Sequence, residues 1–148
     1  MNPEFERAFE KDLNTLAQEI TLCDETQLWE VLPGITNSIG NLAQHLVGNL
    51  NHFIGATLGD TGYVRNRSAE FEERSFNKEE LIHQIQTTAA MVVKVIASLS
   101  PEQLKAVYPY ETFGYPMSCE HKILKLSNHL GYHLGQINYL RRITSSQK

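Results

Sequence analysis

The sequence has little cysteine and no long apolar run. Its 148 residues include two cysteines, Cys23 and Cys119, which lie far apart and form no C-x-x-C pair. We therefore expect free thiols rather than a disulfide framework. The longest apolar stretch, residues 89–97, contains Lys94 and is far shorter than the roughly 20 residues that span a bilayer. The N-terminal residues are acidic and lack an apolar signal core, so we expect a cytoplasmic protein with no membrane partner.

The chain also has little excess charge. It holds 13 Lys and Arg against 17 Asp and Glu, a net charge of -4. A protein that binds a nucleic acid duplex usually shows a basic patch, so we expect no nucleic acid partner. Hydrophobic residues make up 41% and charged residues 20%, which is typical of a globular protein. The length is sufficient for one domain with a real core, which we place over residues 1–148.

What the sequence does contain is helical periodicity. Apolar residues recur at three- and four-residue spacing in four stretches, each with a start signal such as a capping residue or an early proline. We expect four long helices: one opening at Asn2 and Pro3, one from about 37 to 59, one from a cap at 77 to about 99, and one from 118 to about 143. A short helical piece should start at Ser100, and residues 108–116 should form an irregular loop. No alternation typical of strands extends over more than a few residues.

The segment between the second and third helices sets the topology. Residues 60–76 show no strong helical stripe and are longer than the roughly 2–8 residues that join antiparallel neighbours. At up to about 3.3 Å per residue, the segment can return along a bundle. We therefore predict an all-α four-helix bundle with a long crossover between helices 2 and 3, which then run parallel. Arg65 and Arg67 in this segment should lie on a solvated surface, although they could instead bind a charged co-substrate.

Two histidines in the last helix are the strongest functional signal. His129 and His133 are four residues apart, so their side chains share one face of the helix. Such a pair is a recurrent way to supply two ligands to zinc, nickel or a similar ion. Gln136 lies on the same side, and we count it among the residues that line the site. Without a metal, the pair would be two partly buried histidines that bond to other groups.

A mononuclear site needs a further ligand, for which the second helix offers His45 and His52. They are seven residues apart, or roughly 10.5 Å along the axis, so one metal cannot easily use both. His45 lies roughly 140° from the centre of the apolar stripe, and periodicity alone predicts that it is exposed. Its face also holds Asn49, which could line a cleft. The residues alone do not choose between His45 and His52, whereas His83 and His121 should lie on the surface.

Two stretches resemble the DinB family of damage-inducible bacterial proteins: GNLAQHLVG at residues 40–48 and HLGYHLGQINYLRR at residues 129–142. The resemblance extends over nearly the whole chain and implies a four-helix bundle with a crossover connection. Matched residue by residue, it implies that His45, His129 and His133 are the metal ligands. It also implies that metal-dependent thiol S-transferase activity with a low-molecular-weight thiol is the leading possibility.

Two classes of function follow. In the first, the chain is an enzyme that uses a divalent metal, with zinc or nickel favoured, and small-molecule substrates. Three histidines leave coordination positions open, so the metal can activate a thiol for transfer to an electrophile or, alternatively, water for hydrolysis. In the second, the bundle is a non-catalytic, metal-stabilised stress-response binding protein. A cavity beside the histidines would favour the enzyme, which we prefer, although no catalytic acid or base stands out.

Association is the last expectation from the sequence. Trp29, Phe53 and Phe76 fall outside the obvious apolar stripes or at their ends, and an exposed apolar patch often marks an interface. The family resemblance also implies dimers, and symmetric dimers are the commonest oligomers. We therefore expect a homodimer.

Overall fold

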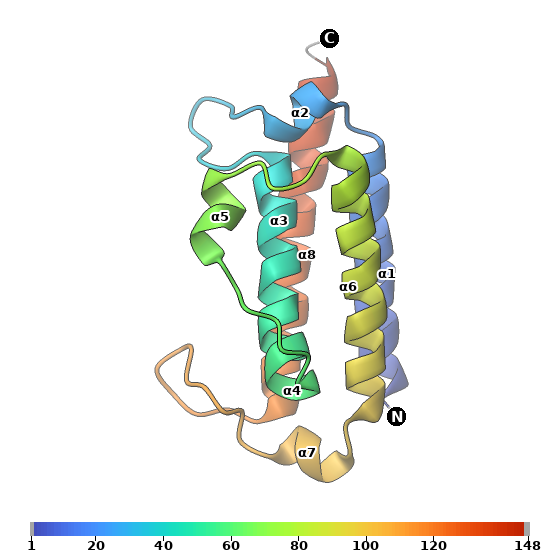
Figure 1. Ribbon diagram of the computed structural model, residues 1–148, viewed down its shortest axis with the longest axis vertical. Coiled ribbons are helices and arrows are strands. Elements are labelled where there is room, and N and C mark those ends of the chain that lie inside the picture. The colour runs from blue at the N-terminus through green and yellow to red at the C-terminus, as the bar shows by residue number, and fades with distance from the viewer. Residues whose placement is uncertain (1, 147–148) are drawn as a thin grey trace.

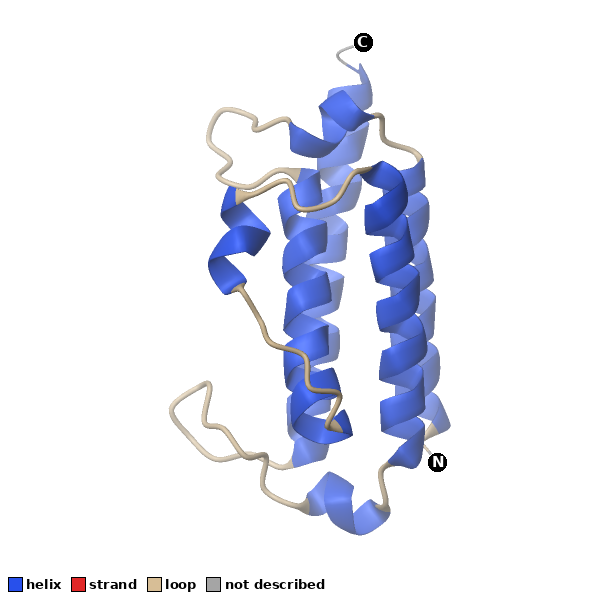
Figure 2. Cartoon of the chain, viewed as in Figure 1, coloured by secondary structure: helices blue, strands red, loops and turns tan. Residues whose placement is uncertain are grey.

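Four long helices pack side by side, as predicted. They are α1 (Pro3–Thr21), α3 (Ile39–Leu50), α6 (Lys78–Ser98) and α8 (Cys119–Ser146). The computed structural model describes residues 2–146 and the side chains of residues 2–145. α3 continues without a break through a π-helical turn, η1 (Asn51–Ala56), and α4 (Thr57–Gly59). Within residues 2–146 no strand forms, only an isolated bridge between Val107 and Ser118, so the predicted all-α class is confirmed (Figure 2).

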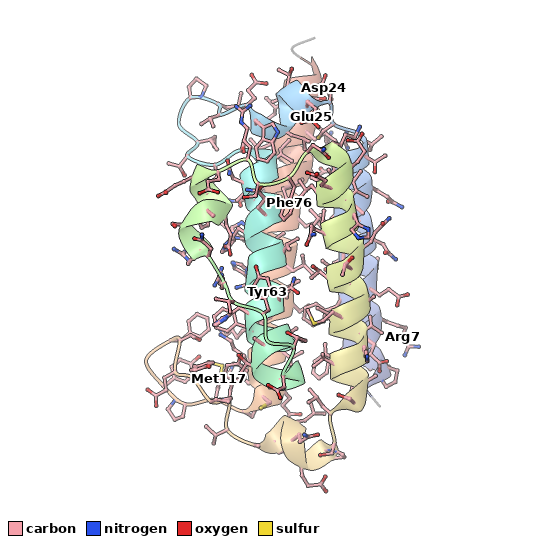
Figure 3. All side chains as sticks on the ribbon, in the orientation of Figure 1. Arg7, Asp24, Glu25, Tyr63, Phe76 and Met117 are labelled. Atoms are coloured by element: carbon pink, nitrogen blue, oxygen red, sulfur yellow. The ribbon has the colours of Figure 1, made fainter. Side chains whose placement is uncertain are left out.

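The crossover between the second and third long helices is confirmed (Figure 1). α1 and α8 run in one direction, while α3 and α6 run in the other. The chain leaves α4 at one end of the bundle, returns along the outside of α3, and enters α6 at the opposite end. In Figure 3, Tyr63 lies on this return segment, in front of α3. α3 contacts both α6 and α8, and α1 contacts the same two helices, which closes the bundle.

The apolar stripes meet in one core. Phe9, Leu13, Leu16 and Ile20 of α1 are almost completely buried. Burying an aliphatic or aromatic side chain of this size contributes about 1.5–3 kcal/mol, so such stripes supply most of the stabilisation of the bundle. A small second cluster closes the end of the bundle, where Met117 lies (Figure 3), and unites Tyr108, Met117 and Cys119.

Helix starts follow the capping signals of the sequence. Asn77 caps α6 by accepting a bond from the Glu80 amide, and the Glu80 side chain accepts one from the Asn77 amide. Ser38 caps α3 by accepting a hydrogen bond from the Asn41 amide. Asn2 differs: its side chain makes no capping bond to α1 but donates to the carbonyls of Ile96 and Leu99. It therefore joins the start of α1 to the end of α6.

The crossover, residues 60–76, has a helical turn that its sequence did not indicate. It contains a short helix, α5 (Arg67–Glu72), which packs on the polar face of α3. Asn41 and Gln44 of α3 each donate to the backbone carbonyls of Glu70 and Glu73. This face of α3 is thus buried beneath α5, and periodicity within one helix could not reveal the covering element. Two more short helices, α2 (Glu25–Trp29) and α7 (Pro101–Lys105), join the long ones at the ends of the bundle.

The prediction that Trp29, Phe53 and Phe76 form an exposed apolar patch was wrong. Trp29 is buried in the core, and the other two residues are half-buried against it. A side chain on Gly40 would overlap the Trp29 ring, which explains why this position of α3 is glycine. None of the described helices is long and apolar enough to cross a membrane.

Candidate metal centre

Three histidines from two helices converge on one point. His45 comes from α3, and His129 and His133 come from α8. The Nε2 atom of His129 lies 3.1 Å from the Nε2 of His45 and 3.1 Å from the Nε2 of His133. One ligand atom from each of the three rings can be chosen so that all lie within 4.8 Å of one another. The structure therefore joins the helical pair of α8 to His45.

Glu70 of α5 holds the His45 ring. His45 Nδ1 donates to Glu70 Oε1 at 2.9 Å, and both side chains are buried. Arg65 holds the same carboxylate, with its Nε 2.9 Å from Oε2 and a terminal nitrogen 2.9 Å from Oε1. A neutral His45 with its proton on Nδ1 presents the Nε2 lone pair to the other histidines. A carboxylate behind a histidine ligand is a common arrangement in metal sites.

The two rings of α8 are held differently. His133 Nδ1 donates to Gln136 Oε1 at 2.7 Å, so the Nε2 of His133 is also left as an acceptor. His129 Nδ1 is buried and has no hydrogen-bond partner among the described residues. The sequence predicted that Gln136 lies beside the site, and in the structure its side chain accepts the hydrogen bond from His133.

Burial and neighbouring charge favour the neutral form of the two imidazoles of α8. Burial, helped by the nearby charges of His133, His45, Arg65 and Lys122, lowers the pKa of His129 to about 4. Burial also lowers the pKa of His133. The neutral form is the one that binds metal ions, so neither ring must lose a proton at neutral pH.

Glu70 is ionised despite its burial. Burial alone raises the pKa of this carboxyl, but its hydrogen bonds with His45 and Arg65, together with the charge of Arg65, outweigh that effect. The net pKa is below the ordinary value. The buried carboxylate therefore brings one negative charge close to the three histidines.

A cavity of about 270 Å³ adjoins the histidines. Its walls include His45, His129 and the predicted lining residue Asn49, together with Phe53, Arg65 and Lys122. A larger apolar cavity of about 640 Å³ lies against Gln136 and Tyr139 of α8. The smaller cavity is bounded by the rings of His45 and His129, so it is the candidate substrate space.

The remaining candidates of the sequence lie elsewhere. His52 is in η1, where it stacks on Tyr110 and takes no part in the histidine group. His83 and His121 are exposed, as expected. Cys23 and Cys119 are both buried, and neither forms a disulfide within the described residues. Burial raises the pKa of Cys119, which makes it a poor nucleophile.

Four features of the site differ from or extend the sequence analysis. His45 is buried rather than exposed, because α5 covers it. Arg65 is an ion-pair partner of Glu70 rather than a solvated residue, whereas Arg67 is exposed. Glu70 had no distinguishing signal among the neighbouring glutamates. Lys122, however, precedes His129 by seven residues and shares its helix face, so spacing on α8 could have identified it.

Comparison with known proteins agrees with this fold. The model of a family described as proteins of unknown function (DUF1572) matches residues 4–148. A search of curated proteins found no significant match. Among solved structures, a DinB-like protein from Bacillus cereus is 17% identical, with a TM-score of 0.75, over 95% of this chain and 91% of that one.

Two further structures share the bundle. YfiT from Bacillus subtilis, described as a probable metal-dependent hydrolase with an unusual four-helix bundle topology, is 14% identical. Its TM-score is 0.77, over 97% of this chain and 87% of that one. A mutant of a mycothiol-dependent maleylpyruvate isomerase is 16% identical, with a TM-score of 0.65, over 93% of this chain and 60% of that one. At these identities the likeness establishes the fold, so the predicted DinB-like architecture is confirmed.

Proposed function

The chain belongs to the DUF1572 family, and we propose that it is a metal-dependent enzyme whose divalent ion is held by His45, His129 and His133. The observation that carries this proposal is the convergence of three imidazoles through Nε2. Metal–nitrogen bonds of about 2.1 Å at tetrahedral or octahedral angles place neighbouring ligand atoms about 3.0–3.4 Å apart. The two Nε2 separations of 3.1 Å fall in this range.

The hydrogen bonds around the histidines support a metal over a purely polar cluster. Glu70 and Gln136 fix the Nδ1 protons of His45 and His133, so both Nε2 atoms are acceptors. A proton on His129 Nε2 can point at only one of them. A cation bound by all three nitrogens satisfies every lone pair at once, and zinc and nickel both favour imidazole. We therefore propose one of these two metals.

We propose thiol S-transfer to an electrophilic small molecule as the reaction. A divalent metal with open coordination positions supplies acidity: it lowers the pKa of a bound thiol or water. The protein's own groups hold and orient the reactants in the adjoining cavity, and the sulfur comes from the co-substrate because Cys23 and Cys119 are buried away from the site. The thiol-dependent isomerase among the similar structures supports this choice, and the cavity argues against a purely structural metal.

Hydrolysis is the second candidate. One similar structure is described as a probable metal-dependent hydrolase, and the same acidity would activate water. The two reactions share the metal site and differ in the nucleophile. The adjoining cavity weighs against the third candidate, a non-catalytic binding protein.

A conjugation assay tests the proposal. The zinc- or nickel-loaded protein is incubated with a low-molecular-weight thiol and an electrophile, and the thioether is quantified. The S–C bond forms as the thiol proton is released and the electrophile loses its leaving group. We expect turnover in the wild-type protein and in His52→Ala, and none in metal-depleted protein or His133→Ala. Ester or amide cleavage without thiol consumption would assign hydrolysis instead, and absence of both would overturn the proposal of an enzyme.

The expected homodimer, the single domain over residues 1–148 and the cytoplasmic location stay proposals. Tyr132, Tyr139 and Ile143 of α8 are exposed and recur at near-helical spacing, which supports an apolar contact surface on this helix. Light scattering at micromolar protein should give about twice the mass of one chain. The mass of a single chain would contradict the dimer.

A further inference from the structure

The cavity beside His45 and His129 is lined by basic side chains. Its basic side chains come from the crossover segment and from the start of α8: Arg65, Arg67, Lys122 and Lys125. No carboxylate is among its lining residues. Since the protein as a whole has a net charge of -4, this cavity has the opposite sign to the average surface. Charges of one sign that cluster in a concave space attract ligands of the opposite charge.

Lys122 is the unusual member of this set. It is 2% exposed, and its Nζ donates to Thr112 Oγ1 at 2.7 Å. The same nitrogen lies 4.0 Å from the centre of the Phe53 ring and 5.2 Å from the centre of the Phe113 ring. Within residues 2–145, no salt bridge involves Lys122. Burying an ammonium group without an anionic partner is costly, and the N-terminal turn of α8 also disfavours a cation.

The neighbouring basic side chains bring no counter-ion to Lys122. Arg65 is paired with Glu70, so it contributes little net charge to the cavity. Lys125 is half-buried and lies over the Phe113 ring. Burial lowers the pKa of Lys122, which is the response of an ammonium group that lacks a counter-ion. A bound anion would stabilise the charged form.

Asn49 adds a second unpaired group in the same cavity. Its side chain is buried, and its Oδ1 has no hydrogen-bond partner among the described residues. Buried polar atoms are nearly always paired in folded proteins, so each exception requires an explanation. A donor group on a ligand in this cavity would satisfy the acceptor.

The arrangement along α8 relates these groups to the histidines. Lys122 precedes His129 by seven residues, which places it about 10.5 Å away along the axis and within about 20° of the same face. Leu126 lies between them on the cavity wall. A small molecule with its anionic group at Lys122 would extend along this face towards the histidines. The cavity of about 270 Å³ suits a small metabolite rather than a polymer.

We propose that this cavity is the binding site for an anionic group, a carboxylate or a phosphate, on the small-molecule substrate, with Lys122 as its main counter-ion and Asn49 as the acceptor for a neighbouring donor. That the bound molecule is a substrate rests on the proposed function. Binding of the anion itself requires only the cavity, so it can be measured independently of the reaction.

Isothermal titration calorimetry tests the proposal with three probes: succinate, inorganic phosphate and the neutral analogue succinamide. Each is titrated into metal-free protein after removal of the chelator, which is itself a polyanion, and into zinc-loaded protein. The variants are Lys122→Met, Lys125→Met and the control Lys94→Met, whose side chain is exposed on α6. Thermal unfolding checks that each variant folds, and Lys122→Met should be at least as stable as the wild type without anion.

We expect succinate or phosphate to bind the wild type and Lys94→Met with equal affinity. Affinity should fall at least about tenfold in Lys122→Met, and by less in Lys125→Met. Succinamide should not bind. The better of the two anions distinguishes a carboxylate from a phosphate substrate. If Lys122→Met does not fold, a loss of anion affinity in Lys125→Met relative to Lys94→Met tests whether the anion binds in this cavity.

Equal anion affinity in the wild type and the lysine variants, or no anion binding in either metal state, would overturn the proposal. Such a result would leave the proposed metal site intact, because metal affinity is measured separately. Conversely, anion binding that depends on Lys122 in a protein that binds no metal would support the cavity and contradict the proposed function. The two failures are therefore distinguishable.

Discussion

The carboxylate of Glu70 occupies the space that a side chain on Gly48 would fill. A Cβ atom at residue 48 would overlap Glu70 Oε2, so glycine at this position of α3 lets α5 approach. Three residues earlier on α3, His45 donates to the same carboxylate. The glycine is therefore linked to the histidine group through Glu70.

Gly48→Ala should weaken metal binding. The added methyl group displaces Glu70 from His45 Nδ1, and losses of such supporting groups typically reduce metal affinity about 10–100-fold. Gly131→Ala is the matched control, because a Cβ there meets nothing within 4 Å. This control should stabilise the protein by about 0.5–1 kcal/mol and leave metal affinity unchanged. Competition titration of zinc and urea unfolding measure the two effects; equal zinc affinity in both variants would refute the link.

Glu70→Gln should produce a similar loss, about 10–100-fold in metal affinity. The neutral amide removes the charge that favours the cationic site and competes poorly for the His45 proton. Glu72→Gln, an exposed neighbour on α5, should have no effect. In a double-mutant cycle, Gly48→Ala should cost little further affinity in the Glu70→Gln background, since both act through the same carboxylate. Additive losses would show that Gly48 acts by another route.

Glu19→Gln tests an ion pair that joins α1 to α8. Glu19 pairs with Arg141 and accepts a 2.8 Å hydrogen bond from Asn138. Burial raises the pKa of Glu19, but the contacts with Arg141 and Asn138 outweigh it, so the folded-state pKa is lowered. Its stabilisation is thus present above the unfolded-state pKa and lost as pH falls through the folded-state value.

The variant should therefore be less stable than the wild type by about 1–2 kcal/mol at about pH 7. The difference should shrink as the pH falls below the ordinary carboxyl pKa and through the lower folded-state value, because protonated Glu19 resembles glutamine. Urea unfolding of both proteins across this range gives the difference directly. A difference that grew with acidification would contradict the assignment.

The sequence predicted the bundle well because its signals are local. The caps at Ser38 and Asn77 and the apolar stripes each lie within one helix, and the length of residues 60–76 alone required a crossover. The errors concern contacts between elements. His45 was expected to be exposed because nothing in α3 reveals that α5 covers it. Glu70 is one of several glutamates in a charged segment, so only the three-dimensional structure distinguishes it.

For the histidine group, too, the sequence predicted the contact within one helix but not the contact between helices. The spacing of His129 and His133 on one helix predicts that they meet, whereas the choice between His45 and His52 depended on family resemblance. The structure brings His45 to the pair and leaves His52 beside Tyr110. The π-helical turn that contains His52 had no sequence signal, although such turns are frequent near functional sites.

Zinc titration of four histidine variants tests the central claim most directly. Metal-free wild-type protein should bind about one equivalent of zinc per chain. His45→Ala, His129→Ala and His133→Ala should each lose more than about 100-fold in affinity, beyond the loss expected for a supporting residue. His52→Ala should bind as the wild type does. A wild-type protein that binds no divalent metal, or a His52→Ala variant that loses as much affinity as His45→Ala, would contradict the account.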